Sequence, residues 1–166
     1  MVTGAGSGIG RGTALRLARE GAYVAALDVV PDGLVGLAEE VGPTESGGQV
    51  VTGPVDISSE DSVKAAIASV TEERGGLDAV VNAAAVHYGD HTHEMSLDRW
   101  NRLLSINLTG TFLMTRETIP ALLESRHGGV IVNFSSTSAY FAHPYMAAYS
   151  ATKGAIMSFT HAIALE

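Results

Sequence analysis

The strongest constraint on the fold is a regular alternation of short apolar runs with longer segments of helical periodicity. Four strands are predicted from runs that are apolar on both faces and bounded by glycine or polar residues: Tyr23–Leu27, Gln49–Val55, Leu77–Val81 and Val130–Phe134. Helices are predicted at Ile9–Glu20, Asp32–Val41, Ser59–Arg74, Leu97–Ser125 and Met146–Glu166. This alternation predicts right-handed βαβ units, and therefore an α/β fold with a doubly wound parallel sheet and helices on both faces.

Local signals refine the ends of these helices. Gly21 is a natural C-cap for the first helix, and Ser58 with Asp61 resembles a capping box before the third. Pro120 should kink or break the fourth helix, because its ring removes a backbone donor. The stretch Gly42–Gly48 is predicted to be a surface loop inside the domain.

Composition bounds the class of protein. The 166 residues are expected to form a single domain, 1–166. A net charge of −8 without a basic cluster argues against nucleic acid or an anionic membrane as partner, and no apolar run reaches the ~18 residues of a membrane span. The chain has no cysteine, so disulfides and thiolate metal sites are excluded. With no room for a signal peptide before Thr3, a cytoplasmic location is expected.

A glycine-rich loop, Thr3-Gly4-Ala5-Gly6-Ser7-Gly8-Ile9-Gly10, opens the first predicted helix. It is not a phosphate-binding P-loop, because no lysine follows, and in a G-x-G-x-x-G motif the third glycine would fall on Ile9. The loop fits G-x-x-x-G-x-G, which lets the backbone turn tightly and a pyrophosphate approach the helix N-terminus. Taken alone, a flexible glycine-rich turn explains it equally well.

Asp28 strengthens the nucleotide interpretation. It ends the predicted strand that begins at Tyr23, 18 residues after Gly10, near the ~20-residue spacing at which an acid accepts hydrogen bonds from an adenosine ribose. The alternative is an Asx-turn before Pro31. Loop, helix and strand-end acid together favour a dinucleotide. Since a carboxylate repels a 2′-phosphate and neither Val29 nor Val30 offers a cation, NAD is expected in preference to NADP.

Tyr149 and Lys153 form a candidate catalytic pair. They stand at i and i+4 of a predicted helix and so share one face. A neighbouring ammonium stabilises a phenolate and makes a tyrosine a more useful acid or base. Ser136, after the last predicted strand, could hydrogen-bond a carbonyl oxygen held by the tyrosine. An ordinary amphipathic pair is the alternative for Tyr149 and Lys153 considered by themselves.

These motifs together resemble the short-chain dehydrogenase/reductase family over nearly the whole chain. The matching features are the T-G-x-x-x-G-x-G loop at Thr3–Gly10, the ribose acid Asp28, the adenine-pocket pair Asp56-Ile57, the helix asparagine Asn107, Ser136 placed 13 residues before Tyr149, and the Y-x-x-x-K core Tyr149–Lys153. The resemblance implies a Rossmann-type fold and the reversible oxidation of a secondary alcohol to a ketone, with NAD carrying the hydride.

The resemblance also implies roles for individual residues. Tyr149 would exchange a proton with the substrate oxygen, and Lys153 would make that phenol more acidic and hold the nicotinamide ribose. Ser136 would polarise the carbonyl, and Asn107 would hold a water that links Lys153 to solvent. The implied cofactor-binding residues are Gly4, Ser7, Gly8, Ile9, Gly10, Asp28, Asp56, Ile57, Asn82, Tyr149 and Lys153.

Two departures from the family pattern stand out. The usual N-N-A-G is replaced by Asn82-Ala83-Ala84-Ala85, and the chain runs only from Met1 to Glu166, so that it is expected to lack family segments at both ends. An alternative function follows: a truncated, catalytically weak dinucleotide-binding protein with a regulatory or vestigial role. Turnover with NAD separates the two. By analogy with the family, self-association through the two last predicted helices is expected.

A histidine-rich loop follows the third predicted strand, with His87, Asp90, His91, His93 and Glu94. An H-x-H pair beside carboxylates could bind Zn²⁺ or Ni²⁺, but a solvated loop that touches the substrate is favoured and no metal is expected. A metal-binding module is the remote third interpretation. A second group is expected to line the substrate pocket and to suit a hydrophobic or cyclic substrate: Tyr140, Phe141, His143, Pro144 and Tyr145.

Overall fold

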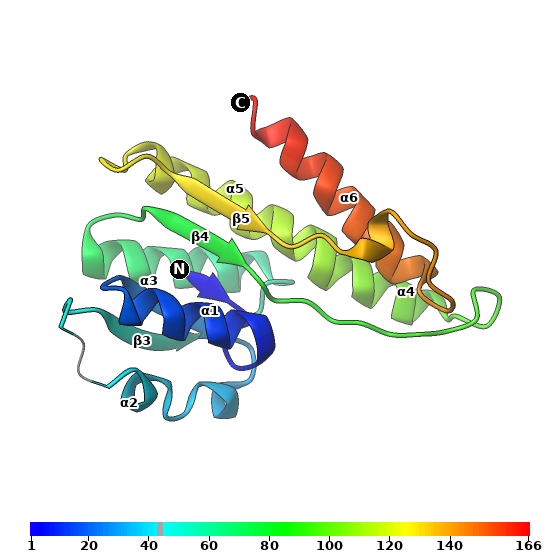
Figure 1. The fold of residues 1–166 in the computed structure, drawn as a ribbon. Helices are drawn as coiled ribbons and strands as arrows, with labels where there is room; N and C mark the ends of the chain where they lie inside the picture. Colours follow the sequence, from blue (N-terminus) through cyan, green and yellow to red (C-terminus); the bar gives the residue numbers. More distant parts are fainter. Residues whose placement is uncertain (43–44) are drawn as a thin grey trace.

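The computed structural model describes residues 1–42 and 45–166 and contains a five-stranded, fully parallel sheet in the order β3-β2-β1-β4-β5. The strands are β1 (Val2–Thr3), β2 (Tyr23–Asp28), β3 (Gln49–Pro54), β4 (Ala79–Asn82) and β5 (Val130–Asn133). The predicted α/β, doubly wound architecture is confirmed (Figure 1). In the predicted loop Gly42–Gly48, residues 43 and 44 lie outside the described part of the chain.

The central strand is the one that the periodicity did not reveal. β1 has only two residues, too few to show a pattern, yet Val2 pairs with Ala26 of β2 on one side and with Val81 of β4 on the other. Val2 and Thr3 are both fully buried. The glycine-rich loop therefore leaves the sheet at its centre, where the direction of strand order reverses.

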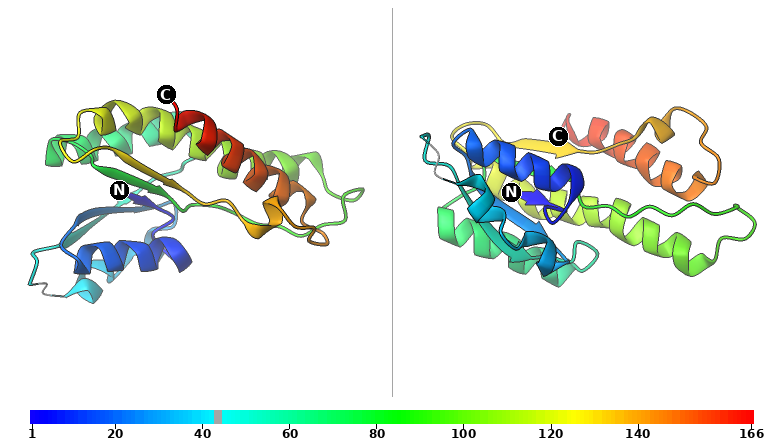
Figure 2. Two further views of the ribbon diagram at one scale, coloured as in Figure 1. Left: turned by 45° about the horizontal axis from the view of Figure 1, so that its top comes forward. Right: turned by 60° about the horizontal axis from the view of Figure 1, so that its bottom comes forward.

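Helices cover the sheet on two faces (Figures 1 and 2). The helical elements are α1 (Gly8–Arg19), η1 (Pro31–Leu34), α2 (Leu37–Val41), α3 (Glu60–Arg74), α4 (Leu97–Leu103), η2 (Leu104–Gly110), α5 (Thr111–Leu123), η3 (Thr137–Ala139) and α6 (Ala147–Ile163). One core cluster joins α1 and α2 to the sheet, and the other joins α3 and α5 to it. Within the described residues, no helix is both long and apolar enough to cross a bilayer.

Three local predictions need correction. The predicted helix Asp32–Val41 is two short pieces, because Gly36 at φ +73° separates η1 from α2. Pro120 does not end its helix, which continues to Leu123; the winding changes instead to π-helical in η2. The cap of α3 is Ser59, which accepts a hydrogen bond from the Ser62 N–H, while Ser58 bonds to Asp56.

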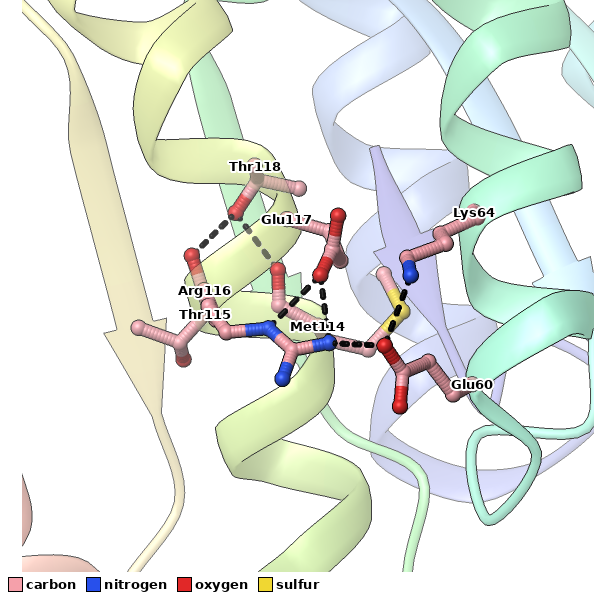
Figure 3. A network of polar contacts seen from close by, with 7 residues as sticks. All are labelled: Glu60, Lys64, Met114, Thr115, Arg116, Glu117 and Thr118. Carbon is pink, nitrogen blue, oxygen red and sulfur yellow. Dashed lines mark hydrogen bonds and ion pairs between the residues drawn. The ribbon is translucent and has the colours of Figure 1, made fainter.

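An ion-pair network ties α3 to α5 on one face of the sheet (Figure 3). Glu60 at the start of α3 contacts Lys64 and Arg116 at 2.7 Å each, and Arg116 also pairs with Glu117. The hydrogen bonds from Lys64 and Arg116 lower the pKa of the Glu60 carboxyl. All four groups are solvent-accessible, so the network orients the two helices more than it stabilises the fold.

Candidate active site

The predicted site residues gather at one edge of the sheet. Because all five strands are parallel, their carboxyl ends lie together, and each of the five strands has a predicted motif at or after this end. The glycine loop follows β1, Asp28 ends β2, Asp56 follows β3, Asn82 ends β4, and Ser136 follows β5. The fold thus brings segments from across the whole chain to a single edge.

Close backbone approach explains two glycines of the loop. A Cβ on Gly10 would lie 2.2 Å from the Gly4 carbonyl oxygen, so that α1 can begin against the loop only with glycine there. Gly4 itself has φ +66°, and its Cβ would lie 2.7 Å from the backbone of Ala84. The glycine loop is therefore packed directly on the segment that follows β4, including Ala83, which stands where the family pattern has asparagine.

The start of α1 leaves groups free for a ligand. Gly8 is at φ +51° with open space on its Cβ side, and Ser7 is the N-cap residue without a side-chain capping bond. Ile9 is 65% exposed despite its apolar side chain. Unoccupied N–H groups at a helix N-terminus, next to open space, form a ready anion-binding site. This geometry accommodates a pyrophosphate.

Asp28 holds the glycine loop against the end of β2. Its Oδ2 accepts a hydrogen bond from the Gly6 N–H at 2.9 Å, and its Oδ1 accepts one from the Val30 N–H at 2.9 Å. The second bond is the Asx-type turn that the sequence left as an alternative. The two interpretations are compatible, since an ionised carboxylate has about four lone-pair sites and two are used.

The pair Asp56-Ile57 divides between surface and core. The Asp56 carboxylate is exposed and accepts hydrogen bonds from the Ser58 N–H and hydroxyl at 2.9 and 2.6 Å. Ile57 is buried and packs so closely on Gly110 that a Cβ there would lie 2.7 Å from the Ile57 side chain. Of these two residues, Asp56 is the one that presents its side chain to solvent.

Asn82 has a mainly structural position. It is buried, and its Nδ2 donates to Asn133 Oδ1 at 2.9 Å and to Thr115 Oγ1 at 3.3 Å. Asn133 in turn donates to Thr160 Oγ1 at 3.0 Å. These bonds fasten the ends of β4 and β5 to each other and to α5 and α6, which sets the spacing between the two loops that follow the strands.

Tyr149 and Lys153 lie together in the first turns of α6, as predicted. The Lys153 Nζ is 5.6 Å from the centroid of the Tyr149 ring. Lys153 is only 4% exposed, and its ammonium donates to the Phe134 carbonyl oxygen at 2.8 Å. Burial lowers the pKa of the Lys153 ammonium from its ordinary value. A buried cation beside a phenol is an arrangement suited to proton transfer.

Asn107 lies in the π-helical stretch η2 and is fully buried. Its side-chain amide forms a two-way clamp on Val86: Nδ2 donates to the Val86 carbonyl oxygen and Oδ1 accepts from the Val86 N–H, both at 2.8 Å. Nδ2 also donates to Thr152 Oγ1 at 3.3 Å. Asn107 thereby connects the loop after β4 to the residue that precedes Lys153.

Ser136 begins η3, which packs against α6. Its hydroxyl oxygen accepts a hydrogen bond from the Ser138 N–H at 3.2 Å, whereas the neighbouring Ser135 hydroxyl donates to the Lys153 carbonyl oxygen at 2.9 Å. The structure brings Tyr149, Lys153 and Asn107 into one connected group. Ser136 reaches that group through Ser135 and not through a direct contact with Tyr149.

Three groups at the site were not found from the sequence: the backbone of Val86, the Phe134 carbonyl and the Thr152 hydroxyl. Backbone groups leave no trace in side-chain patterns. Thr152 could have been noticed because it stands between Ala148 and Ile156 at four-residue spacing, as a polar residue on an otherwise apolar helix face.

The histidine-rich loop forms the outer rim of the site. His91 and His93 have ring centroids 5.6 Å apart, and His87 lies against Tyr149. Among the described residues, no three His, Cys, Asp or Glu side chains are grouped so as to hold a metal ion. A cavity of about 270 Å³ lies between this loop, α4 and the start of α6, and Asp90, Met95, Trp100 and Ala148 are among its lining residues.

Known proteins are similar to this chain in sequence and in fold. The sequence model of the family described as short chain dehydrogenase matches residues 1–166. A 2-(S)-hydroxypropyl-CoM dehydrogenase 3 from Xanthobacter autotrophicus is 38% identical over 99% of this chain and 64% of its own length. A 3beta-hydroxysteroid dehydrogenase from Mediterraneibacter gnavus is 38% identical over the whole chain and 59% of its own length.

A solved structure of a dehydrogenase has the same fold as this chain. Carveol dehydrogenase from Mycobacterium avium, in complex with NAD, superposes with a TM-score of 0.91 at 31% identity, covering 99% of this chain and 63% of that one. The chain thus spans about three fifths of the length of the relatives it matches. With a family match over every residue and the motifs at one sheet edge, the chain belongs to the short-chain dehydrogenase family.

Proposed function

We propose that the chain provides the cofactor-binding and catalytic part of an oxidoreductase that interconverts a secondary alcohol and a ketone. The observation that carries the proposal is the buried Lys153 ammonium beside Tyr149, at the same sheet edge as the glycine loop. A glycine loop alone indicates a nucleotide, and a tyrosine–lysine pair alone indicates little. Their meeting at one edge supports a redox reaction.

The proposed cofactor is NAD. The N–H groups at the start of α1 would hold its pyrophosphate, Asp28 its adenosine ribose and Asp56 its adenine, while Lys153 would bind the second ribose. When bound, NAD accepts or supplies the hydride. NAD in the related carveol dehydrogenase structure supports this choice. The preference over NADP rests on Asp28, whose carboxylate would face a 2′-phosphate.

In the proposed reaction Tyr149 carries the proton. Its phenol donates to the substrate oxygen when a ketone is reduced and accepts when an alcohol is oxidised. Lys153 favours the phenolate through its charge, and the Phe134 carbonyl keeps that ammonium at the end of β5. Ser136 would turn its hydroxyl towards the substrate oxygen.

Asn107 holds the segments around Tyr149 and Lys153 in place. Because its amide is bonded to Val86 and Thr152, it fixes the loop after β4 relative to the helix that carries Tyr149 and Lys153. The water-holding role that the family resemblance implies would fall to groups of Asn107 that these bonds leave free. Both roles are compatible with a buried, fully oriented amide.

The substrate class follows from the relatives and the rim. The names of the relatives describe dehydrogenases of a hydroxypropyl compound, glucose, a hydroxysteroid and carveol. Tyr140 and Phe141, in the segment between η3 and α6, are exposed at 69% and 68%, and these aromatic side chains support a hydrophobic or cyclic alcohol. A cytoplasmic location remains a prediction from composition.

We also propose that the chain self-associates. Leu97 is 71% exposed and Trp100 36% exposed one turn later on α4, and Phe112 is 39% exposed further along the same helical run. Val130 and Val132 on the edge strand β5 are 50% and 40% exposed. Exposed apolar side chains at this density favour contact with another copy.

The test of the proposed function is Tyr149→Phe, which removes the proton-carrying oxygen and keeps the ring. Turnover of NAD with carveol, glucose and a 3β-hydroxysteroid should fall at least 100-fold, as expected for loss of a general acid, while calorimetric NAD affinity stays within about twofold. Tyr23→Phe, at the opposite edge of the sheet, is the matched control and should leave both unchanged. A Tyr149→Phe variant as active as the unaltered chain would refute the mechanism.

A further inference from the structure

Two segments meet beside Tyr149 through contacts that the proposed chemistry does not use. Residues 87–91 follow β4, and Tyr145 with Met146 directly precedes α6. The Asp90 N–H donates to the Tyr145 carbonyl oxygen at 3.0 Å, and the His91 and Tyr145 rings meet edge to face with centroids 4.7 Å apart. We call these contacts, together with those of His87 described below, the clasp.

The clasp holds a strained turn. Tyr145 has φ +64°, and it is the one non-glycine residue with positive φ in the described ranges 1–42 and 45–166. A bulky residue adopts this conformation only where its surroundings enforce it. Here the enforcing groups come from the loop after β4, through Asp90 and His91. Since α6 begins two residues later, the clasp fixes the direction in which the Tyr149 helix starts.

His87 extends the clasp to the catalytic ring. Its centroid lies 5.4 Å from that of Tyr149, with the ring planes at 86°. The neighbouring Val86 is clamped by the Asn107 amide at both its N–H and its carbonyl, and His87 Nε2 lies 3.1 Å from Met146 Sδ. The histidine ring is thus held on the side of its own backbone and on the side of α6.

We propose that His87 is a positioning residue, whose ring packs on the Tyr149 ring and holds that side chain, and with it the phenol oxygen, in place for proton transfer. The inference deepens the proposed function and rests on it, because the orientation of Tyr149 matters most if Tyr149 carries the proton. What His87 contributes is an aromatic ring in an edge-to-face contact. It transfers no proton, so a different ring of similar size should replace it.

Steady-state kinetics tests the role of the ring. With NAD and the alcohol that the unaltered chain oxidises fastest among carveol, glucose and a 3β-hydroxysteroid, His87→Ala should lower kcat about tenfold and leave KM within about twofold. His87→Phe should restore kcat to within about twofold. His161→Ala, an exposed histidine further along α6, is the control and should change neither constant. A His87→Phe variant as slow as His87→Ala would overturn the proposal, because it would show that the polar atoms act.

A second readout does not need turnover. Aromatic ¹³C NMR, with the Tyr149 signal assigned by its loss in Tyr149→Phe, reports how fast the phenol ring flips. Flipping should become at least tenfold faster in His87→Ala and stay unchanged in His87→Phe and His161→Ala. Faster flipping in a chain that shows no turnover would support the positioning role and reject the proposed function. Unchanged flipping with intact turnover would overturn the positioning role alone.

Discussion

The two flanks of the central strand β1 differ in where they leave apolar side chains exposed. On the β2–β3 flank these side chains belong to the segments that follow β1 and β2, and on the β4–β5 flank they lie along α4, α5 and β5. On the β2–β3 flank, α1 and α2 close a core with Ala14, Leu37 and Val50 among its buried members. On the β4–β5 flank, β5 is an edge strand with half-exposed valines, and α4 presents Leu97 and Trp100 to solvent. The first flank carries the proposed nucleotide site, and the second carries Tyr149, Lys153 and the clasp.

Because of this difference, we expect NAD binding and turnover to depend on different flanks of the sheet. Contacts within the described chain hold the glycine loop and Asp28 in place. We therefore expect the affinity for the nucleotide to depend mainly on these residues. The catalytic side leaves apolar surface uncovered, and water reaches its rim at Tyr140 and Phe141. Because exclusion of water and closure over the substrate contribute strongly to rate, we expect measurable NAD binding with slow turnover.

The largest effect is expected from Gly10→Ala, a substitution in α1 on the β2–β3 flank. The new Cβ would lie 2.2 Å from the Gly4 carbonyl oxygen, and the loop would have to move. Calorimetric NAD affinity should fall at least 100-fold, and the free energy of unfolding by about 1–3 kcal/mol. Gly12→Ala, in the same helix with open space around it, should instead keep NAD affinity and gain about 0.5–1 kcal/mol. Equal losses in both variants would contradict the account.

The exposed apolar side chains of the β4–β5 flank predict self-association of the chain. We expect the unaltered chain to form dimers or larger species, and Leu97→Lys to shift it towards monomer, because a charge at an apolar contact is costly. Leu97 is 71% exposed, so the folded monomer should be little affected. Val35→Lys, at a residue 75% exposed on the other flank, is the control. If sedimentation velocity shows that the unaltered chain is a monomer, the proposed self-association through the β4–β5 flank is wrong.

Periodicity and motif spacing predicted the sheet type, four of the five strands and the edge of the sheet at which the candidate residues lie. They missed β1, because two residues carry no period, and misplaced the break in the long helix, because the π-helical turn at Asn107 has no side-chain signature comparable to proline. The motif pattern put Tyr149 and Lys153 together correctly. It could not show that Asn82 bonds to Asn133, or that His87 lies against Tyr149, since both contacts depend on how distant loops meet.

The most direct measurement is a calorimetric comparison of NAD and NADP binding to the unaltered chain. Asp28 already accepts two backbone hydrogen bonds and would place its remaining lone pairs towards the adenosine ribose. The account predicts that NAD binds at least tenfold more tightly, since one unfavourable charge contact exceeds about 1.4 kcal/mol. Equal affinities, or no binding of either nucleotide, would contradict the assignment of this sheet edge as an NAD site.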